Sequence, residues 1–112
     1  MAHYLVELYT PNARWQALPA AQRQAFLEGI QQALGGLSAQ GIEVLALAEA
    51  EPGIDQASAH RFVGIWRFPS PAARAALLAG IQASGWYGYF DHVNAACAAG
   101  GFAGHLAALA AA

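Results

Sequence analysis

The sequence has no lysine, a single cysteine and few charged residues of either sign. Charged residues make up 11% of the 112 residues, the net charge is -2, and all five basic residues are arginines. So little positive charge excludes a basic surface for phosphate backbones, and we expect no nucleic-acid partner. The single cysteine, Cys97, cannot form an internal disulfide. It therefore favours a protein of the reducing cytoplasm.

Signals for secretion and for membrane insertion are also lacking. The first residues carry no basic stretch, and Glu7 interrupts their apolar run, so they do not resemble a signal peptide. The last 18 residues are nearly all small or apolar, but three glycines and His105 interrupt them. Because alanine is only weakly hydrophobic, we expect no membrane-spanning helix and no membrane partner.

Apolar residues are abundant instead. They make up 57% of the chain, and 29 residues are alanine. This length is sufficient for one domain, over residues 1–112, with a core over about 3–98 and a C-terminal extension over about 99–112. A chain with so few charges has apolar surface left over, which predicts contact with a second chain.

The pattern of apolar residues predicts four strands and three helices. Alternation indicates strands over 3–9, 42–49, 60–68 and 91–97, and helical periodicity indicates helices over 19–39, 71–84 and 102–111. The order β-α-β-β-α-β is that of a ferredoxin-like α+β fold, an antiparallel sheet with two helices on one face. The last predicted helix, over residues 102–111, is additional to this fold. The uncovered sheet face predicts a homodimer that buries it.

Two further features carry a resemblance to a known family. The strand that begins at His60 ends in Phe68-Pro69-Ser70 before an alanine-rich helix, and the aromatic run Trp86-Tyr87-Gly88-Tyr89-Phe90 leads into Asp91 and the last strand. Over about residues 3–98 the chain resembles the dimeric α/β-barrel superfamily. This superfamily includes antibiotic-biosynthesis monooxygenases, muconolactone isomerase and YCII-like proteins. The muconolactone-isomerase-like pattern is the nearest. The resemblance implies a homodimeric barrel with a pocket at the sheet, and it favours the fold more than any activity.

Strand alternation assigns side chains to two faces. In the first strand Tyr4, Val6 and Leu8 form an apolar face, which we expect against the helices, and the mixed face would line the pocket opposite the helices. By the same pattern, Cys97 is expected to pack on the helix side as a small core residue. The third strand is ambiguous, and we favour the face of Phe62 and Trp66 for the pocket.

The scarce polar groups on the mixed face suggest acid–base chemistry. We take His92, His3 and Glu7 as candidate catalytic residues, because a histidine beside a carboxylate in an apolar cavity is tuned for proton transfer near neutral pH. Asp91 and His92, as strand neighbours, point to opposite faces and are not expected to act together. The candidate substrate-pocket residues are Tyr9, His60, Trp66, Tyr89, Phe90 and Asn94.

These residues favour a small-molecule enzyme acting on a flat apolar or aromatic substrate. The reaction would be cofactor-independent oxygenation or an isomerase- or lyase-type proton transfer. One alternative is a non-catalytic ligand-binding or structural homodimer, in which Glu7 pairs with an arginine and His92 only fills an interface. Another is a haem- or metal-binding member of the same fold, although the four histidines are widely spaced. We expect no cofactor and no metal.

Overall fold

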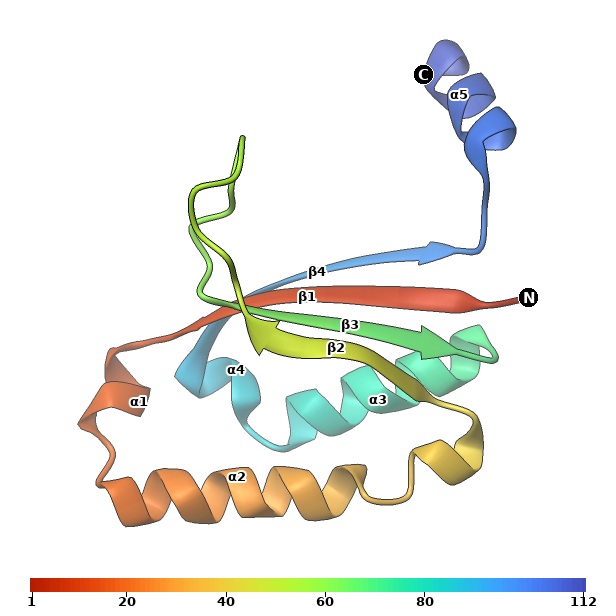
Figure 1. Cartoon of the computed structure of the whole chain (residues 1–112). Coiled ribbons are helices and arrows are strands. Elements are labelled where there is room, and N and C mark those ends of the chain that lie inside the picture. Colours follow the sequence, from red (N-terminus) through yellow and green to blue (C-terminus); the bar gives the residue numbers. More distant parts are fainter.

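The computed structural model describes residues 1–112 and contains all the strands that the sequence predicts (Figure 1). In chain order the elements are β1 (His3–Pro11), α1 (Ala13–Ala17), α2 (Ala20–Leu34), the 3-10 helix η1 (Ser38–Gln40), β2 (Glu43–Glu49), β3 (Phe62–Phe68), α3 (Pro71–Ala83), α4 (Trp86–Tyr89), β4 (Phe90–Ala98) and α5 (Phe102–Ala111).

The four strands form one antiparallel sheet in the order β2-β3-β1-β4. The central pair is β1 and β3, and β4 flanks β1, as expected. Both long helices, α2 and α3, lie on the same side of the sheet (Figure 1). The fold is therefore the ferredoxin-like α+β arrangement that the element order predicts.

Local sequence explains where the helices begin and end. The Ser70 side chain accepts a hydrogen bond from the backbone of Ala73, and Pro71 takes the first position of α3, as predicted. The first long helix is shorter than expected, because it ends before Gly35-Gly36. The aromatic run also differs from the prediction, since Gly85 at φ 84° starts the short helix α4 within it.

The two faces of the sheet are exchanged relative to the prediction. Leu5 is fully buried under the helices, in a core that also contains Trp66, Phe68, Ile42 and Leu77. The mixed face of β1 is therefore the helix-covered face. Alternation divides the side chains into two sets, but it does not say which set the helices cover.

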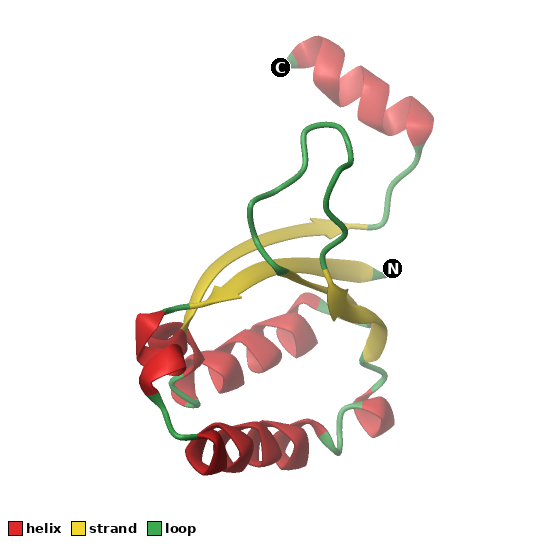
Figure 2. Cartoon of the chain, turned by 60° about the vertical axis from the view of Figure 1, so that its left-hand side comes forward, coloured by secondary structure: helices red, strands yellow, loops and turns green.

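The opposite, open face of the sheet is apolar. Strand register brings Val6 beside Ile65 and Ala95, and Leu8 beside Val63 and Val93. No helix covers this side (Figures 1 and 2). Cys97 belongs to this face and is exposed, so its assignment to the core is wrong. The open sheet face comprises the apolar residues just described and Cys97, together with Tyr4, Ala46 and Ala48.

The C-terminal helix α5 projects on the open side of the sheet and away from it (Figures 1 and 2). All its residues are exposed, including Phe102, Leu106 and Leu109. No helix of the structure has both the length and the apolar character needed to span a membrane.

Candidate functional site

A cavity of about 670 Å³ lies between the sheet and the helices α2 and α3. Its lining is mostly aliphatic and aromatic, and its polar side chains are Glu7, Gln40 and Ser84, with the hydroxyl of Tyr9. No residue of α2 is fully buried. This helix therefore lines the cavity but does not pack tightly against the sheet. Apolar pockets of several hundred Å³ with a few polar groups are typical of small-molecule sites.

Glu7 is the one carboxylate of this cavity, and only 4% of its surface is exposed. The indole nitrogen of Trp66 donates to Glu7 Oε1 over 2.5 Å. His92 Nε2 lies 3.3 Å from the other oxygen, Oε2. Trp66 reaches Glu7 from β3 and His92 reaches it from β4, so both neighbouring strands hold the carboxylate. One oxygen of the buried carboxylate thus accepts a hydrogen bond from Trp66, and the other faces His92.

Gly64 makes room for this arrangement. It is the cross-strand neighbour of Glu7. A Cβ at Gly64 would lie 3.1 Å from Glu7 Oε1 and 3.3 Å from Trp66 Nε1. Both distances are shorter than ordinary van der Waals contact. The glycine is therefore needed for the close approach of the carboxylate and the indole.

We expect Gly64→Ala to destabilise the protein by about 1–3 kcal/mol, because the new methyl group overpacks a filled site. It should also displace Glu7 from the Trp66 indole. Chemical denaturation measures the first effect, and the indole N–H resonance of Trp66 reports the second. The matched control is Gly36→Ala, where a Cβ meets nothing within 4 Å. Equal stability of the two variants would contradict this role for Gly64.

His92 is held by a second set of hydrogen bonds. Trp86 Nε1 donates to His92 Nδ1 over 3.0 Å, and His92 Nε2 lies 2.6 Å from Asn94 Oδ1. The Tyr9 ring stacks on the imidazole at 5.5 Å. The His92 side chain is 2% exposed, so this contact with Glu7 is shielded from water.

Burial controls the electrostatics of the site. It raises the pKa of the Glu7 carboxyl above its ordinary value, and the hydrogen bond from Trp66 and the proximity of His92 only partly oppose this. Burial also raises the pKa of the Tyr9 hydroxyl, and the negative charge of Glu7 adds to that effect. No arginine or histidine lines the cavity. The groups that stabilise ionised Glu7 are therefore the Trp66 indole and the nearby His92.

The structure brings several of the predicted site residues together. Glu7, Tyr9 and Trp66 line the cavity, and His92 and Asn94 join them through hydrogen bonds. Phe90 lies behind this group, stacked on Trp86 with ring centroids 3.9 Å apart. Their clustering follows from the register, because Tyr9 is opposite His92 and Glu7 is opposite Asn94.

Other predicted residues lie elsewhere. His3 is at the far end of β1, opposite Phe68 and Ala98, and does not approach His92. The ring of His60 interacts with Thr10 Oγ1 at 3.1 Å, before β3 begins, and does not line the cavity. Tyr89 packs against Trp15 and Phe26 in an aromatic cluster at the end of the sheet.

Sequence reasoning missed Trp86 as a polar partner. The sequence places Trp86 only in an aromatic run before the last strand, because the α4 turn that directs its indole toward His92 has no clear local signal. The left-handed Gly85 is the one feature that marks the turn.

Haem and metal ligation do not fit this site. No group of three metal-binding side chains occurs in the structure. None of the four histidines lines the cavity, and both ring nitrogens of His92 are engaged by protein groups. A haem iron held by histidine needs a free imidazole nitrogen directed at the cofactor.

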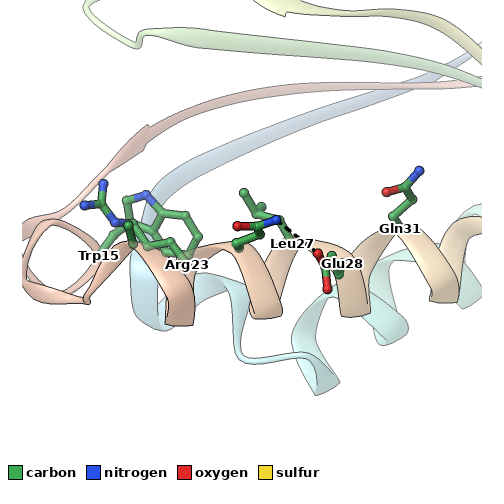
Figure 3. A pocket seen from close by; sticks show the side chains of 7 residues that line it. Trp15, Arg23, Leu27, Glu28 and Gln31 are labelled. Carbon is green, nitrogen blue, oxygen red and sulfur yellow. Dashed lines mark hydrogen bonds between the residues drawn. The ribbon is translucent and has the colours of Figure 1, made fainter.

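A second, more open pocket of about 600 Å³ runs along α2 from Trp15 to Gln31 (Figure 3). It shares Leu27 with the cavity, and Gln24 donates to Glu28 within it. Its polar side chains are already paired or solvated, since Arg23 donates to the Leu18 carbonyl. This pocket has no cluster of groups suited to catalysis.

Comparisons with solved structures support the fold. A mutant chlorite dismutase from Candidatus Nitrospira defluvii is similar with a TM-score of 0.70 and 9% identity, over 90% of this chain and 41% of that one. An Arabidopsis thaliana protein gives 0.55 and 12%, over 89% of both chains. A dabb family protein with a ferredoxin-like fold from Mesorhizobium loti gives 0.53 and 16%, over 89% and 98%.

At these identities the likeness concerns the ferredoxin-like fold and no particular activity. The chain spans only 41% and 42% of the two chlorite dismutase chains that it resembles. No curated protein matches the sequence. The model of one family matches residues 2–112, almost the whole chain. The chain therefore belongs to the family of unknown function DUF6616.

Proposed function

We propose that this protein is a small-molecule enzyme in which Glu7 removes a proton from a neutral, flat, apolar substrate. The observation that carries the proposal is a buried carboxylate at the wall of a 670 Å³ apolar cavity whose lining includes no arginine or histidine. A carboxylate with a raised pKa accepts a proton more readily than one in water. The hydrogen bond from Trp66 to one oxygen and the contact of His92 with the other fix its position.

The same first step serves both classes of reaction that the sequence suggests. Glu7 takes a proton from an acidic C–H or O–H group, and the substrate becomes an enolate or phenolate. In an isomerase, protonated Glu7 returns this proton to a different carbon. In cofactor-independent oxygenation, the carbanion reacts with dioxygen as co-reactant. The proposal is limited to the shared proton transfer.

The shape and charge of the cavity select the substrate. Its walls include the aromatic side chains of Trp66, Trp86 and Phe26, which favour a planar ring system. Because no cation lines it, a substrate carboxylate or phosphate would be unpaired beside Glu7. We therefore favour neutral phenols and enolisable ketones, and disfavour the acidic lactones that the muconolactone-isomerase-like pattern implies.

A matched ligand series tests this choice. We expect 1-naphthol and 2-tetralone to raise the melting temperature, and 1-naphthoate, which has a similar ring but a negative charge, to have little effect. In Gly29→Leu the new side chain would project from α2, at a position that lines the cavity and where a Cβ meets nothing within 4 Å. It should fill the cavity and weaken binding of the neutral ligands at least tenfold, measured by calorimetry. Preferential binding of the anion would refute the proposed substrate class.

We further propose that the protein is a homodimer through the open sheet face. This face is apolar at its centre, around Val6 and Ile65, and nothing in the chain covers it. Two sheets that pack face to face bury such side chains between them. The helix α5 rises on the same side and exposes Phe102, Leu106 and Leu109. Isolated helices of ten residues are marginal in water, so α5 is expected to pack against the second copy.

The exposed free thiol of Cys97 lies on this face and fits a reducing compartment, which supports a cytoplasmic location.

If the ligand series binds but no proton transfer occurs, the non-catalytic binding alternative is favoured. In that case Glu7 serves as a hydrogen-bond acceptor for the ligand.

A further inference from the structure

The surroundings of His92 permit only one arrangement of its ring hydrogens. An indole nitrogen donates hydrogen bonds and cannot accept them. Trp86 Nε1 lies 3.0 Å from His92 Nδ1. Nδ1 must therefore accept this hydrogen bond, and it carries no hydrogen. The single hydrogen of the neutral ring is then on Nε2.

The other side of the ring is complementary to this arrangement. His92 Nε2 lies 2.6 Å from Asn94 Oδ1, which accepts its hydrogen, and Glu7 Oε2 lies 3.3 Å from the same nitrogen. Asn94 has to present its oxygen, because a ring with no hydrogen on Nδ1 has to carry one on Nε2. The amide nitrogen of Asn94 faces the Tyr87 hydroxyl at 3.4 Å, which is compatible with that orientation.

We infer that Trp86 and Asn94 hold His92 as a neutral imidazole whose Nε2 hydrogen is donated to Asn94 beside Glu7, which makes His92 a positioning residue and Glu7 the single proton acceptor. The role given to Glu7 rests on the proposed function, whereas the state of His92 does not. A ring whose Nδ1 is occupied by an indole N–H cannot pass a proton from one nitrogen to the other.

The charged and titratable groups around the ring show why Trp86 is decisive. From β1, Glu7 approaches Nε2 and the Tyr9 ring stacks on the imidazole. From α4, the Tyr87 ring contacts it edge-on at 5.0 Å. A carboxylate alone would favour the doubly protonated, charged ring. That form places an N–H on Nδ1 against the indole N–H, so Trp86 opposes it.

The inference predicts the spectrum of the free protein. Two-bond 1H–15N correlation spectra distinguish the two neutral forms of histidine from the charged ring. We expect His92 at pH 7 to show the hydrogen on Nε2 and an unprotonated Nδ1. In Trp86→Phe, which keeps an aromatic ring against Phe90, the fraction of His92 rings with a hydrogen on Nδ1 should rise roughly threefold or more, because no indole N–H faces that nitrogen. The matched control is Trp66→Phe, which removes the indole bonded to Glu7 and should leave the hydrogen positions of His92 unchanged.

A hydrogen on Nδ1, or a charged ring at pH 7 in the unsubstituted protein, would overturn the inference even if Trp86→Phe fails to fold. An unaltered spectrum in folded Trp86→Phe would overturn it too.

A functional test separates donation from proton relay. His92→Gln retains an N–H donor and should keep most of the ligand affinity. His92→Leu has no such donor, and its ligand affinity should fall at least tenfold. If the unsubstituted protein binds none of the ligands in the series but His92 shows the expected spectrum, the proposed function is refuted and the inference about His92 stands.

Discussion

Glu7→Gln is expected to lower the rate of proton abstraction by about 10²–10⁴-fold and, at the same time, to remove a pH dependence of the protein's stability. Glutamine has nearly the same shape and keeps an acceptor for the Trp66 indole, but it is never charged. The rate is measured as deuterium uptake by 2-tetralone in heavy water. Such a loss together with an intact fold would identify the carboxylate, and not the cavity alone, as the base.

The stability change should depend on pH in a defined direction. Because burial raises the pKa of Glu7 above its ordinary value of 4.5, the native state binds more protons than the unfolded chain just above that pH. Stability is therefore lost as the pH rises from about 4.5 through the raised native pKa. Glu7→Gln should remove this loss, so its stability should fall less between pH 5 and pH 8 than that of the unsubstituted protein, which thermal unfolding measures.

Glu43→Gln is the matched control for both measurements. Glu43 is a strand carboxylate that pairs with Arg67 at the surface, with half of its side chain exposed. Its removal should change stability by less than about 1 kcal/mol and leave the exchange rate unaltered. A Glu7→Gln variant that retained full exchange activity would refute the role of Glu7 as the base.

Val6→Asp is expected to convert the dimer into a folded monomer. Val6 lies on a central strand in the middle of the open sheet face, between Ile65 and Ala95. In a face-to-face dimer the new carboxylate would be buried without a partner, which weakens association by about 10²–10³-fold. In the monomer it faces water, so the fold is retained. Sedimentation velocity measures the mass, and circular dichroism checks the fold.

The control for this variant is Gln31→Asp, on the exposed side of α2, which should remain dimeric. The paired substitution Leu106→Ser and Leu109→Ser tests the contribution of α5 and should weaken the dimer less than Val6→Asp. A monomeric unsubstituted protein at micromolar concentration would contradict the proposed dimer. It would leave the cavity and Glu7 unaffected, because both lie on the other side of the sheet.

The candidate site was partly predictable because strand alternation fixes neighbours. Glu7, Tyr9, His92 and Asn94 were assigned to one face, and the register places them opposite one another. His3 belongs to the same face and was included for that reason. Alternation does not say which residue of β4 lies opposite each residue of β1, and only the register shows that His92 lies beside Tyr9 and Glu7 while His3 lies opposite Ala98.

The sequence by itself determined the element order, the ferredoxin-like topology and the division of each strand into two faces, because these depend on local periodicity and turn residues. Only the tertiary structure decided which face the helices cover. That choice depends on how α2 and α3 fit against Leu5, Trp66 and Phe68, and on the room they leave beside Glu7. The hydrogen bond from Trp86 to His92 also depends on packing, since a four-residue helix directs the indole. Such contacts join residues through space, and the hydrophobic pattern of the chain does not encode them.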